Sequence, residues 1–235
     1  MPVRSQPRQL PLAIEPVRTW GGRQPGAGRP RGPRPRVLHR ERPDLSQDHP
    51  VHVTFRIRRG LPSLRRPRFQ RAFRQALVQV TARRGDFRVV HYSVQRDHVH
   101  CLIEAEGKQA LSNGMKSLGA RFARTVNRVF ERTGPVLDGR YHARVLKTPG
   151  EVRKALAYVL LNARKHYAQA HGHPPPVRLD RFSSGVWFQG WRSGAWERPN
   201  YSRETGVPFT WLLSRGWRRC GLIDPAEIPG GGCPG

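Results

Sequence analysis

Two short clusters of side chains in this 235-residue chain have the types and spacing of reactive or metal-binding groups. His98-Val99-His100 sets two imidazoles two residues apart, and Tyr158 stands four residues before Asn162. Two imidazoles that point the same way can share one divalent metal ion, which usually needs at least one further ligand. The amide oxygen of Asn162 suits that position, and the Tyr158 phenol would then stand within reach of whatever the metal polarises.

Each cluster also has an ordinary explanation. The chain holds ten histidines, so a His-x-His pair can arise by chance, and a tyrosine on a helix commonly fills the core or the surface. Other His and Tyr residues compete for the same roles, namely His91, His142, His166, Tyr92, Tyr141 and Tyr167. Tyr167 is the most serious competitor because it belongs to the same predicted helix as Tyr158.

The elements that carry the two clusters can be predicted from side-chain periodicity. Residues 98–105 are expected to form a strand, in which alternate side chains face opposite ways. Both imidazoles would then share one face, and Val99 would point into the core. A helix is predicted from Glu151 to about Ala170, after a Thr148-Pro149 start signal. Residues four apart in a helix share a face, so Tyr158 and Asn162 should project together.

The surrounding patterns complete a recognisable order of elements. Alternating apolar and polar residues predict strands at 51–58, 87–95 and 141–146, and helical spacing predicts helices at 66–83 and 111–130. The order β-α-β-β-α-β, followed by one more helix, predicts an α+β fold. Its core would be a ferredoxin-like split β-α-β-β-α-β arrangement, with an added C-terminal helix that carries the tyrosine.

Two flanking segments differ in composition from this central domain, residues 51–171. Residues 1–50 are rich in Arg, Pro and Gly, which predicts a disordered basic arm that could grip phosphates or could be a solvated tail. Residues 172–235 hold five of the six tryptophans and are predicted to form an irregular extension, with one short docking helix at 211–223. Its aromatic side chains could stack on bases, but more often such residues pack an extension against a core.

Charge is the strongest feature of the overall composition. Lys and Arg total 43 against 16 Asp and Glu, a net of +27, and a chain this basic favours a polyanionic partner such as nucleic acid. Three cysteines, Cys101, Cys220 and Cys233, lack the spacing of a zinc ribbon or a disulfide framework and favour a reducing compartment. With no membrane-spanning apolar run, the protein is expected to be soluble and cytoplasmic.

The motifs together resemble a known family. DHVHCLIEA around His98 and His100, GRYHARVL from Gly139, and AYVLLNARKH around Tyr158 occur in the order and spacing of the single-tyrosine HUH transposases. Within them, the chain is most similar to the REP-associated tyrosine transposases. The resemblance covers about half of the chain, from Val51 to about His171.

This resemblance implies a function and its parts. His98, His100 and Asn162 would hold a divalent metal, Mg²⁺ or Mn²⁺, and Tyr158 would be the catalytic nucleophile. The enzyme would cleave and rejoin single-stranded DNA that contains hairpins, through a 5′-phosphotyrosine intermediate that leaves a free 3′-hydroxyl. It would work beside the bacterial nucleoid in the cytoplasm. Relatives include monomers and homodimers, and the sequence does not choose between them.

Basic side chains on the predicted helices are candidates for contacts with the DNA backbone. They are Arg121, Arg124, Arg128, Lys154 and Lys165, although many such residues simply solvate a helix face. Another function on the same fold is a non-catalytic or domesticated nucleic-acid-binding protein. An RNA-recognition sheet would display aromatics on its central strands. The predicted hairpin offers only Tyr92 there, which disfavours that form of the alternative.

Overall fold

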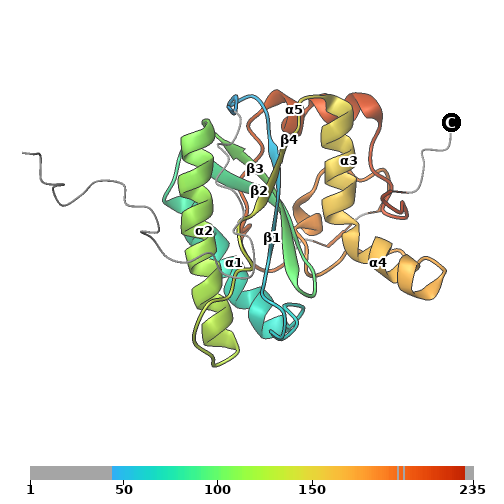
Figure 1. Cartoon of the computed structure of the whole chain (residues 1–235). Coiled ribbons are helices and arrows are strands. Elements are labelled where there is room, and N and C mark those ends of the chain that lie inside the picture. Colours follow the sequence, from blue (N-terminus) through green and yellow to red (C-terminus); the bar gives the residue numbers. More distant parts are fainter. Residues whose placement is uncertain (1–43, 195, 198, 231–235) are drawn as a thin grey trace, which may run out of the picture. The chain divides into compact units, whose positions relative to one another are not determined.

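The computed structural model describes residues 44–194, 196–197 and 199–230, all within one unit of the chain, His39–Gly235. In chain order the elements are β1 (Val51–Arg56), α1 (Pro67–Ala82), β2 (Phe87–Val94), β3 (His98–Ala105), α2 (Lys108–Val129), β4 (His142–Val145), α3 (Pro149–Leu160), α4 (Asn162–His171), η1 (Gly185–Trp187), α5 (Trp211–Ser214) and η2 (Gly216–Cys220) (Figure 1). The predicted basic arm falls outside the described residues up to residue 43. In the part that is described, no helix is both long enough and apolar enough to cross a membrane.

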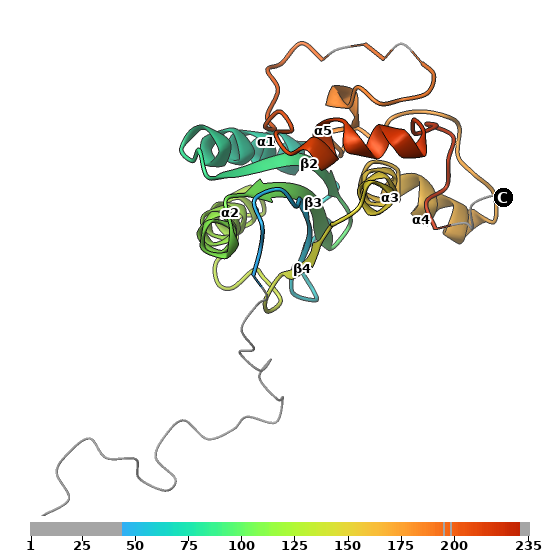
Figure 2. The same cartoon turned by 90° about the horizontal axis from the view of Figure 1, so that it is seen from above.

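The four strands form one antiparallel sheet in the order β2-β3-β1-β4. Because side chains alternate along β1, Val51, Val53 and Phe55 face one side of the sheet while its polar residues face the other. Helices α1 and α2 cover the apolar side, where their aromatic residues join the strand residues in one core cluster (Figures 1 and 2). The predicted α+β class is confirmed, and each strand and both covering helices lie within three residues of the predicted bounds.

The opposite face of the sheet is covered by α3, which has a second apolar cluster beneath it. Leu102 of β3 packs there with Leu156 and Val159 of α3. Nearer the start of β3 this face becomes polar, because Thr54 and Ser93 flank His100 in the strand register. This face of the sheet is therefore apolar where Leu102 packs against α3 and polar around His100.

The helix predicted from Glu151 to Ala170 is two helices, so the prediction of one continuous helix was wrong. Its start is as expected, since Thr148 and Glu151 form a reciprocal capping box. The break falls at Leu161, whose φ of −109° and ψ of 13° are outside the helical range, and α4 begins at Asn162. The sequence around Leu161 has neither Pro nor Gly, so nothing local signals this break.

Two arginines tie the α3–α4 pair to the C-terminal extension. The buried Arg164 donates from Nε to the Ala226 carbonyl at 2.9 Å and from Nη1 to the Pro175 and Pro176 carbonyls at 2.8 and 3.1 Å. On α3, Arg153 forms a bidentate pair with Glu227. We call these contacts the arginine brace. The brace therefore joins the helix on each side of the break at Leu161 to the extension.

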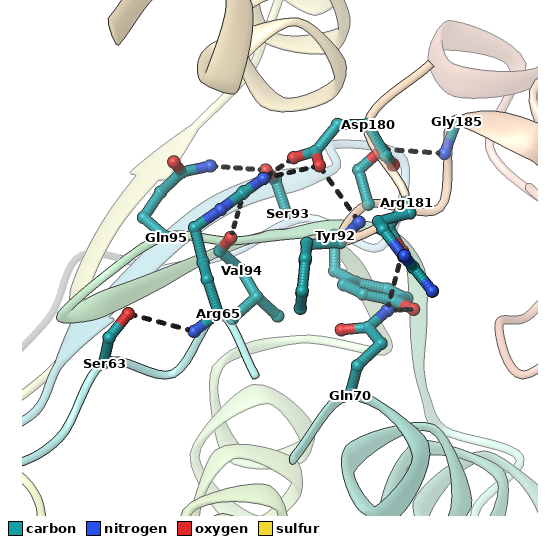
Figure 3. Close-up of polar contacts among 12 residues, drawn as sticks. Ser63, Arg65, Gln70, Tyr92, Ser93, Val94, Gln95, Asp180, Arg181 and Gly185 are labelled. Carbon is teal, nitrogen blue, oxygen red and sulfur yellow. Dashed lines mark hydrogen bonds and ion pairs between the residues drawn. The ribbon is translucent and has the colours of Figure 1, made fainter. Parts of the chain in front are cut away.

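A second set of polar contacts fixes the start of the extension on β2 (Figure 3). Arg65 donates to both carboxylate oxygens of Asp180 at 2.8 Å and also to the Val94 carbonyl at 2.9 Å. Beside it, Gln70 donates to the Tyr92 hydroxyl at 3.1 Å and to the Arg181 carbonyl. A residue before α1 is thereby joined to one in the extension, across the edge of the sheet.

Replacing Asp180 with Ala should lower the free energy of unfolding by about 1.5–3 kcal/mol, because each lost hydrogen bond is charge-assisted and Arg65 is left partly buried. Urea unfolding followed by circular dichroism measures the change. Asp86→Ala is the matched control, since its pair with Arg84 is local in sequence and its carboxylate is more exposed. That control should cost less than about 1 kcal/mol. Equal losses in the two variants would contradict this assignment.

Most aromatic residues of the extension pack inward, as such residues more often do. Phe188 and Trp217 are buried with 5.3 Å between ring centroids, and Trp191 packs against Phe188. A methyl group at Gly190 would lie 2.1 Å from Trp217, so only glycine allows this close approach. The helix predicted at 211–223 is shorter and divided, with α5 ending at Ser214 and η2 following from Gly216.

Candidate active site

The His-x-His pair lies at the start of β3, on the face that α3 covers. His98 and His100 share this face with 4.8 Å between ring centroids, while Val99 is buried in the core cluster on the other face. The strand period of two therefore places all three side chains as predicted. His100 is buried and His98 is partly buried, so both imidazoles sit in the protein rather than on its surface.

One ring nitrogen of His100 is held by two side chains from β1. Its Nδ1 lies 2.9 Å from the Thr54 hydroxyl and 3.2 Å from Nε2 of His52. Its Nε2 is buried and has no hydrogen-bond partner among the described residues. This arrangement suits a neutral ring that carries its proton on Nδ1, because the lone pair on Nε2 is then free for a ligand.

His98 has a similar arrangement with its neighbour in sequence. Its Nδ1 lies 2.7 Å from Oδ1 of Asp97. Partial burial alone would raise the pKa of Asp97, but the hydrogen bond to His98 and the charge of Arg56 lower it below its usual value. An ionised carboxylate on Nδ1 orients the ring and makes its other nitrogen more basic, as carboxylates that hydrogen-bond to metal-binding histidines do.

Burial keeps two of the imidazoles at the site uncharged. It lowers the pKa of His100 to about 3, with further contributions from His52 and His98. Burial and the charge of Arg144 lower the pKa of His52 to about 4. Both rings are therefore neutral at pH 7, which is the form that binds metal ions or accepts hydrogen bonds.

Tyr158 stands over these histidines. Its ring centroid is 5.1 Å from that of His100 and 5.8 Å from that of His52, both edge to face. The ammonium of Lys165 lies 5.0 Å from the centroid of the same ring. The tyrosine therefore joins a cluster of imidazoles on one side and a cation from α4 on the other.

Asn162 is the first residue of α4 and is fully buried. Neither its amide oxygen nor its amide nitrogen has a hydrogen-bond partner among the described residues. An unsatisfied buried amide costs about 1–3 kcal/mol per group, so each such group calls for a reason. One turn on, the His166 ring is 6.4 Å from the His98 ring, which shows that this face of α4 lies beside the histidine pair.

The donor set fits a divalent metal ion. Within the described residues, no group of three or more His, Cys, Asp or Glu side chains is arranged to hold one. Two histidines and an amide oxygen are a different set, and here the buried Nε2 of His100 and the buried amide of Asn162 both lack partners. Imidazole nitrogen and amide oxygen can both bind a divalent ion, and a bound ion would satisfy the unpaired atoms.

His52 and Thr54 are site residues that periodicity did not single out. They lie on β1, 48 and 46 residues before His100, and reach it only because β1 is the neighbour of β3 in the sheet. The sequence signal that could have found them is their place in the alternation of VHVTFR, which puts both on the polar face of a strand.

The structure does not bring all of the predicted DNA-binding residues to the site. Lys165 is beside Tyr158, and the exposed Lys154 is one turn before Tyr158 on α3. Three arginines of α2 instead line a groove of about 380 Å³ against α1, on the opposite face of the sheet; they are Arg121, Arg124 and Arg128. A role for these three in binding DNA remains a prediction.

Three of the competing residues lie elsewhere or are otherwise engaged. Tyr167 stacks on His171 at 4.0 Å between centroids. Tyr92 is buried in the core cluster and donates to Glu204 at 2.6 Å, and burial together with Glu204 raises its pKa well above the usual value. His91 is buried against the Ser184 hydroxyl. None of these three matches Tyr158 in its closeness to the His-x-His pair.

The His-x-His pair of the sheet thus lies beneath the helix that bears Tyr158, and part of the chain is similar to a known family. Residues 46–148 match the family described as "Transposase IS200 like". The matched range is 103 of the 235 residues of the chain. The match includes His52, His98 and His100 and ends before α3, so Tyr158 and Asn162 lie beyond it.

Among solved structures, one of a REP-associated tyrosine transposase bound to a REP hairpin is similar to this chain. The similarity covers 59% of this chain and 89% of that one, with 16% sequence identity and a TM-score of 0.46. No curated protein matches the sequence significantly.

Proposed function

We propose that this protein is a metal-dependent transposase-like enzyme that cleaves and rejoins single-stranded DNA, including DNA with hairpins. Tyr158 is the nucleophile, and His98, His100 and Asn162 are the metal ligands. The observation that carries the proposal is the position of Tyr158, 5.1 Å by ring centroids from a buried His100 whose Nε2 lacks a partner. The similarity of residues 46–148 to the IS200-like transposase family supports this class of reaction. We also propose that the sheet order is the ferredoxin-like one.

The reaction can be written in balanced steps. The Tyr158 oxygen bonds to the scissile phosphorus, the bond from phosphorus to the 3′-oxygen breaks, and the phenolic proton is lost as the 3′-oxygen gains one. The products are a 5′-phosphotyrosine and a free 3′-hydroxyl. Attack by a 3′-hydroxyl on the phosphotyrosine reverses these changes, so rejoining needs no external energy source. A divalent ion, when bound, supplies charge withdrawal from the scissile phosphate.

The residues of the chain supply the remaining requirements. Thr54 and His52 orient His100, and Asp97 orients His98. A phenol has a pKa of about 10, so it is a weak nucleophile at neutral pH. The Lys165 ammonium places positive charge beside the ring in which negative charge develops as the proton leaves. Packing of α3 on the sheet keeps the tyrosine close to the histidines.

The test is to incubate the full chain with single-stranded hairpin DNA labelled at either end, with Mn²⁺ or with EDTA. A denaturing gel then reveals any covalent protein–DNA adduct. We expect an adduct that forms only with metal and retains the 3′ label, because a 5′-phosphotyrosine stays joined to the 3′ portion of the strand. An adduct that retains the 5′ label, or no adduct from any hairpin that binds, would overturn the proposal.

Thr54→Val should weaken Mn²⁺ binding by about 10–100-fold, the usual cost of losing a hydrogen-bond partner of a metal-binding histidine. The change keeps the shape of the side chain but removes the oxygen 2.9 Å from Nδ1 of His100, so the ring loses a restraint on its orientation and proton position. Isothermal titration with Mn²⁺ measures the effect independently of activity. Thr81→Val is the matched control, because that hydroxyl of α1 is buried without a partner, and metal affinity should not change. Equal affinity in the two variants would show that Thr54 does not position His100.

A further inference from the structure

Three apolar side chains near the start of α5 are exposed to solvent, whereas Phe182, Phe188 and Trp217 of the same extension are buried. Phe209 is 77% exposed, Val207 65% and Trp211 48%. Exposed apolar side chains that lie near one another can mark an interaction site. We call Phe209 and Trp211 the aromatic ledge.

The ledge is held rigidly although its rings are exposed. The buried carboxylate of Glu104 accepts hydrogen bonds from the backbone N–H groups of Phe209 and Thr210 at 2.8 Å and from the Thr210 hydroxyl at 2.8 Å. The Thr210 side chain also caps α5 by accepting from the Leu213 N–H. A fixed backbone lowers the entropy cost of binding, because the two rings need not be ordered by the ligand.

Each ring of the ledge has an arginine beside it. The guanidinium carbon of Arg88 lies 5.1 Å from the Phe209 ring centroid, and that of Arg219 lies 4.8 Å from the Trp211 ring. Trp211 lies close against Gly216, where a Cβ would come within 2.6 Å of the indole. Aromatic faces for bases and guanidinium groups for phosphates are the combination that binds single-stranded nucleic acid. The net charge of +27 favours the same polyanion.

The ledge lies on the tyrosine side of the sheet, at the other end of β3. Glu104 shares a face with His98 and His100 because the three are separated by even numbers of residues along the strand. Six residues separate His98 from Glu104, which is about 20 Å at roughly 3.3 Å per residue. At a rise of about 3.4 Å per nucleotide, roughly six stacked nucleotides cover that length.

We infer that the aromatic ledge is a second nucleic-acid contact, which stacks on unpaired bases of single-stranded DNA at a distance from Tyr158. The contact does not depend on catalysis, so it goes beyond the proposed reaction and can be tested without it. Base stacking on an aromatic residue contributes about 1–3 kcal/mol per base, which is a change in affinity of about 5–150-fold.

The experiment measures binding of the full-length Tyr158→Phe protein to a fluorescent oligothymidylate of about 16 nucleotides, a typical upper site size, and to a blunt duplex. Phe209→Ala and Trp211→Ala should each lower affinity for the single strand by at least about fivefold, with the salt dependence nearly unchanged because no phosphate contact is lost. Affinity for the duplex should stay within about twofold, because paired bases cannot stack on the ledge. Val177→Ala, which truncates another exposed apolar residue, is the matched control and should change neither.

Two further variants keep the test decisive. Phe209→Leu retains apolar area without an aromatic face and should lose as much affinity as Phe209→Ala, whereas Trp211→Phe should retain most of it. Unchanged affinity in both alanine variants, or full affinity in Phe209→Leu, would overturn the inference. If the parent protein is a dimer by light scattering and Trp211→Ala is a monomer, the ledge binds a second copy of the chain, and the inference is overturned in that way.

Discussion

Replacing Tyr158 with Phe should abolish the covalent protein–DNA adduct while changing DNA affinity by no more than about twofold. The variant removes only the phenolic oxygen and keeps the ring that packs edge to face on His100. Loss of a covalent nucleophile can cost about 10⁶-fold in rate, so the adduct should fall below detection. A denaturing gel measures the adduct, and fluorescence anisotropy measures affinity.

Tyr167→Phe is the matched control for this prediction. It removes the phenolic oxygen from a tyrosine of α4 whose ring stacks on His171. The rings of His52, His98 and His100 are instead grouped around Tyr158. The control should form adduct at the parent rate. If instead Tyr167→Phe loses the adduct and Tyr158→Phe keeps it, the nucleophile has been misassigned, while the metal site on β3 would still stand.

Replacing Asn162 with Leu should make the metal-free protein more stable and at the same time weaken or abolish metal binding. The two residues have similar volumes, and the amide has two buried atoms without partners. Removing them relieves a cost of about 1–3 kcal/mol per group, so the free energy of unfolding in EDTA should rise. The upward shift in melting temperature that Mn²⁺ gives the parent protein should shrink or disappear. Urea unfolding and thermal melts measure the two effects.

Asn127→Leu is the control variant, and it should change the free energy of unfolding in the opposite direction. The Asn127 amide donates to the Gly134 carbonyl at 3.0 Å and accepts from Arg132, so its loss should destabilise the protein and leave the Mn²⁺ shift intact. If Asn162→Leu is more stable but Mn²⁺ still raises its melting temperature as much as in the parent protein, Asn162 is not a metal ligand. If Asn162→Leu is less stable than the parent protein, the Asn162 amide has hydrogen-bond partners in solution.

Much of the site could be predicted from the sequence because its main parts depend on short-range periodicity. The two-residue period of a strand places His98 and His100 together and sends Val99 to the core. The capping box at Thr148 fixes where α3 begins. These features need only a few neighbouring residues, so one sequence is enough to find them.

The rest could not be predicted because it depends on contacts between distant segments. Thr54 reaches His100 through the order of strands in the sheet, which alternation within one strand does not specify. The break at Leu161 has no local sequence signal, and Arg164, just after it, binds carbonyls of the distant residues 175, 176 and 226. Helical periodicity identified Arg121 as a surface residue, but which side of the sheet α2 covers is decided by the whole fold.

The arginine brace has a consequence for how the protein matures during synthesis. Every candidate catalytic residue is translated by residue 162, yet Arg153 and Arg164 find their partners at residues 226 and 227. Because a chain folds progressively from its N-terminus as it is made, α3 and α4 emerge from the ribosome before the segment that fixes the angle between them. The nascent chain therefore contains the tyrosine and the histidines some 60 residues before the arginine brace can form.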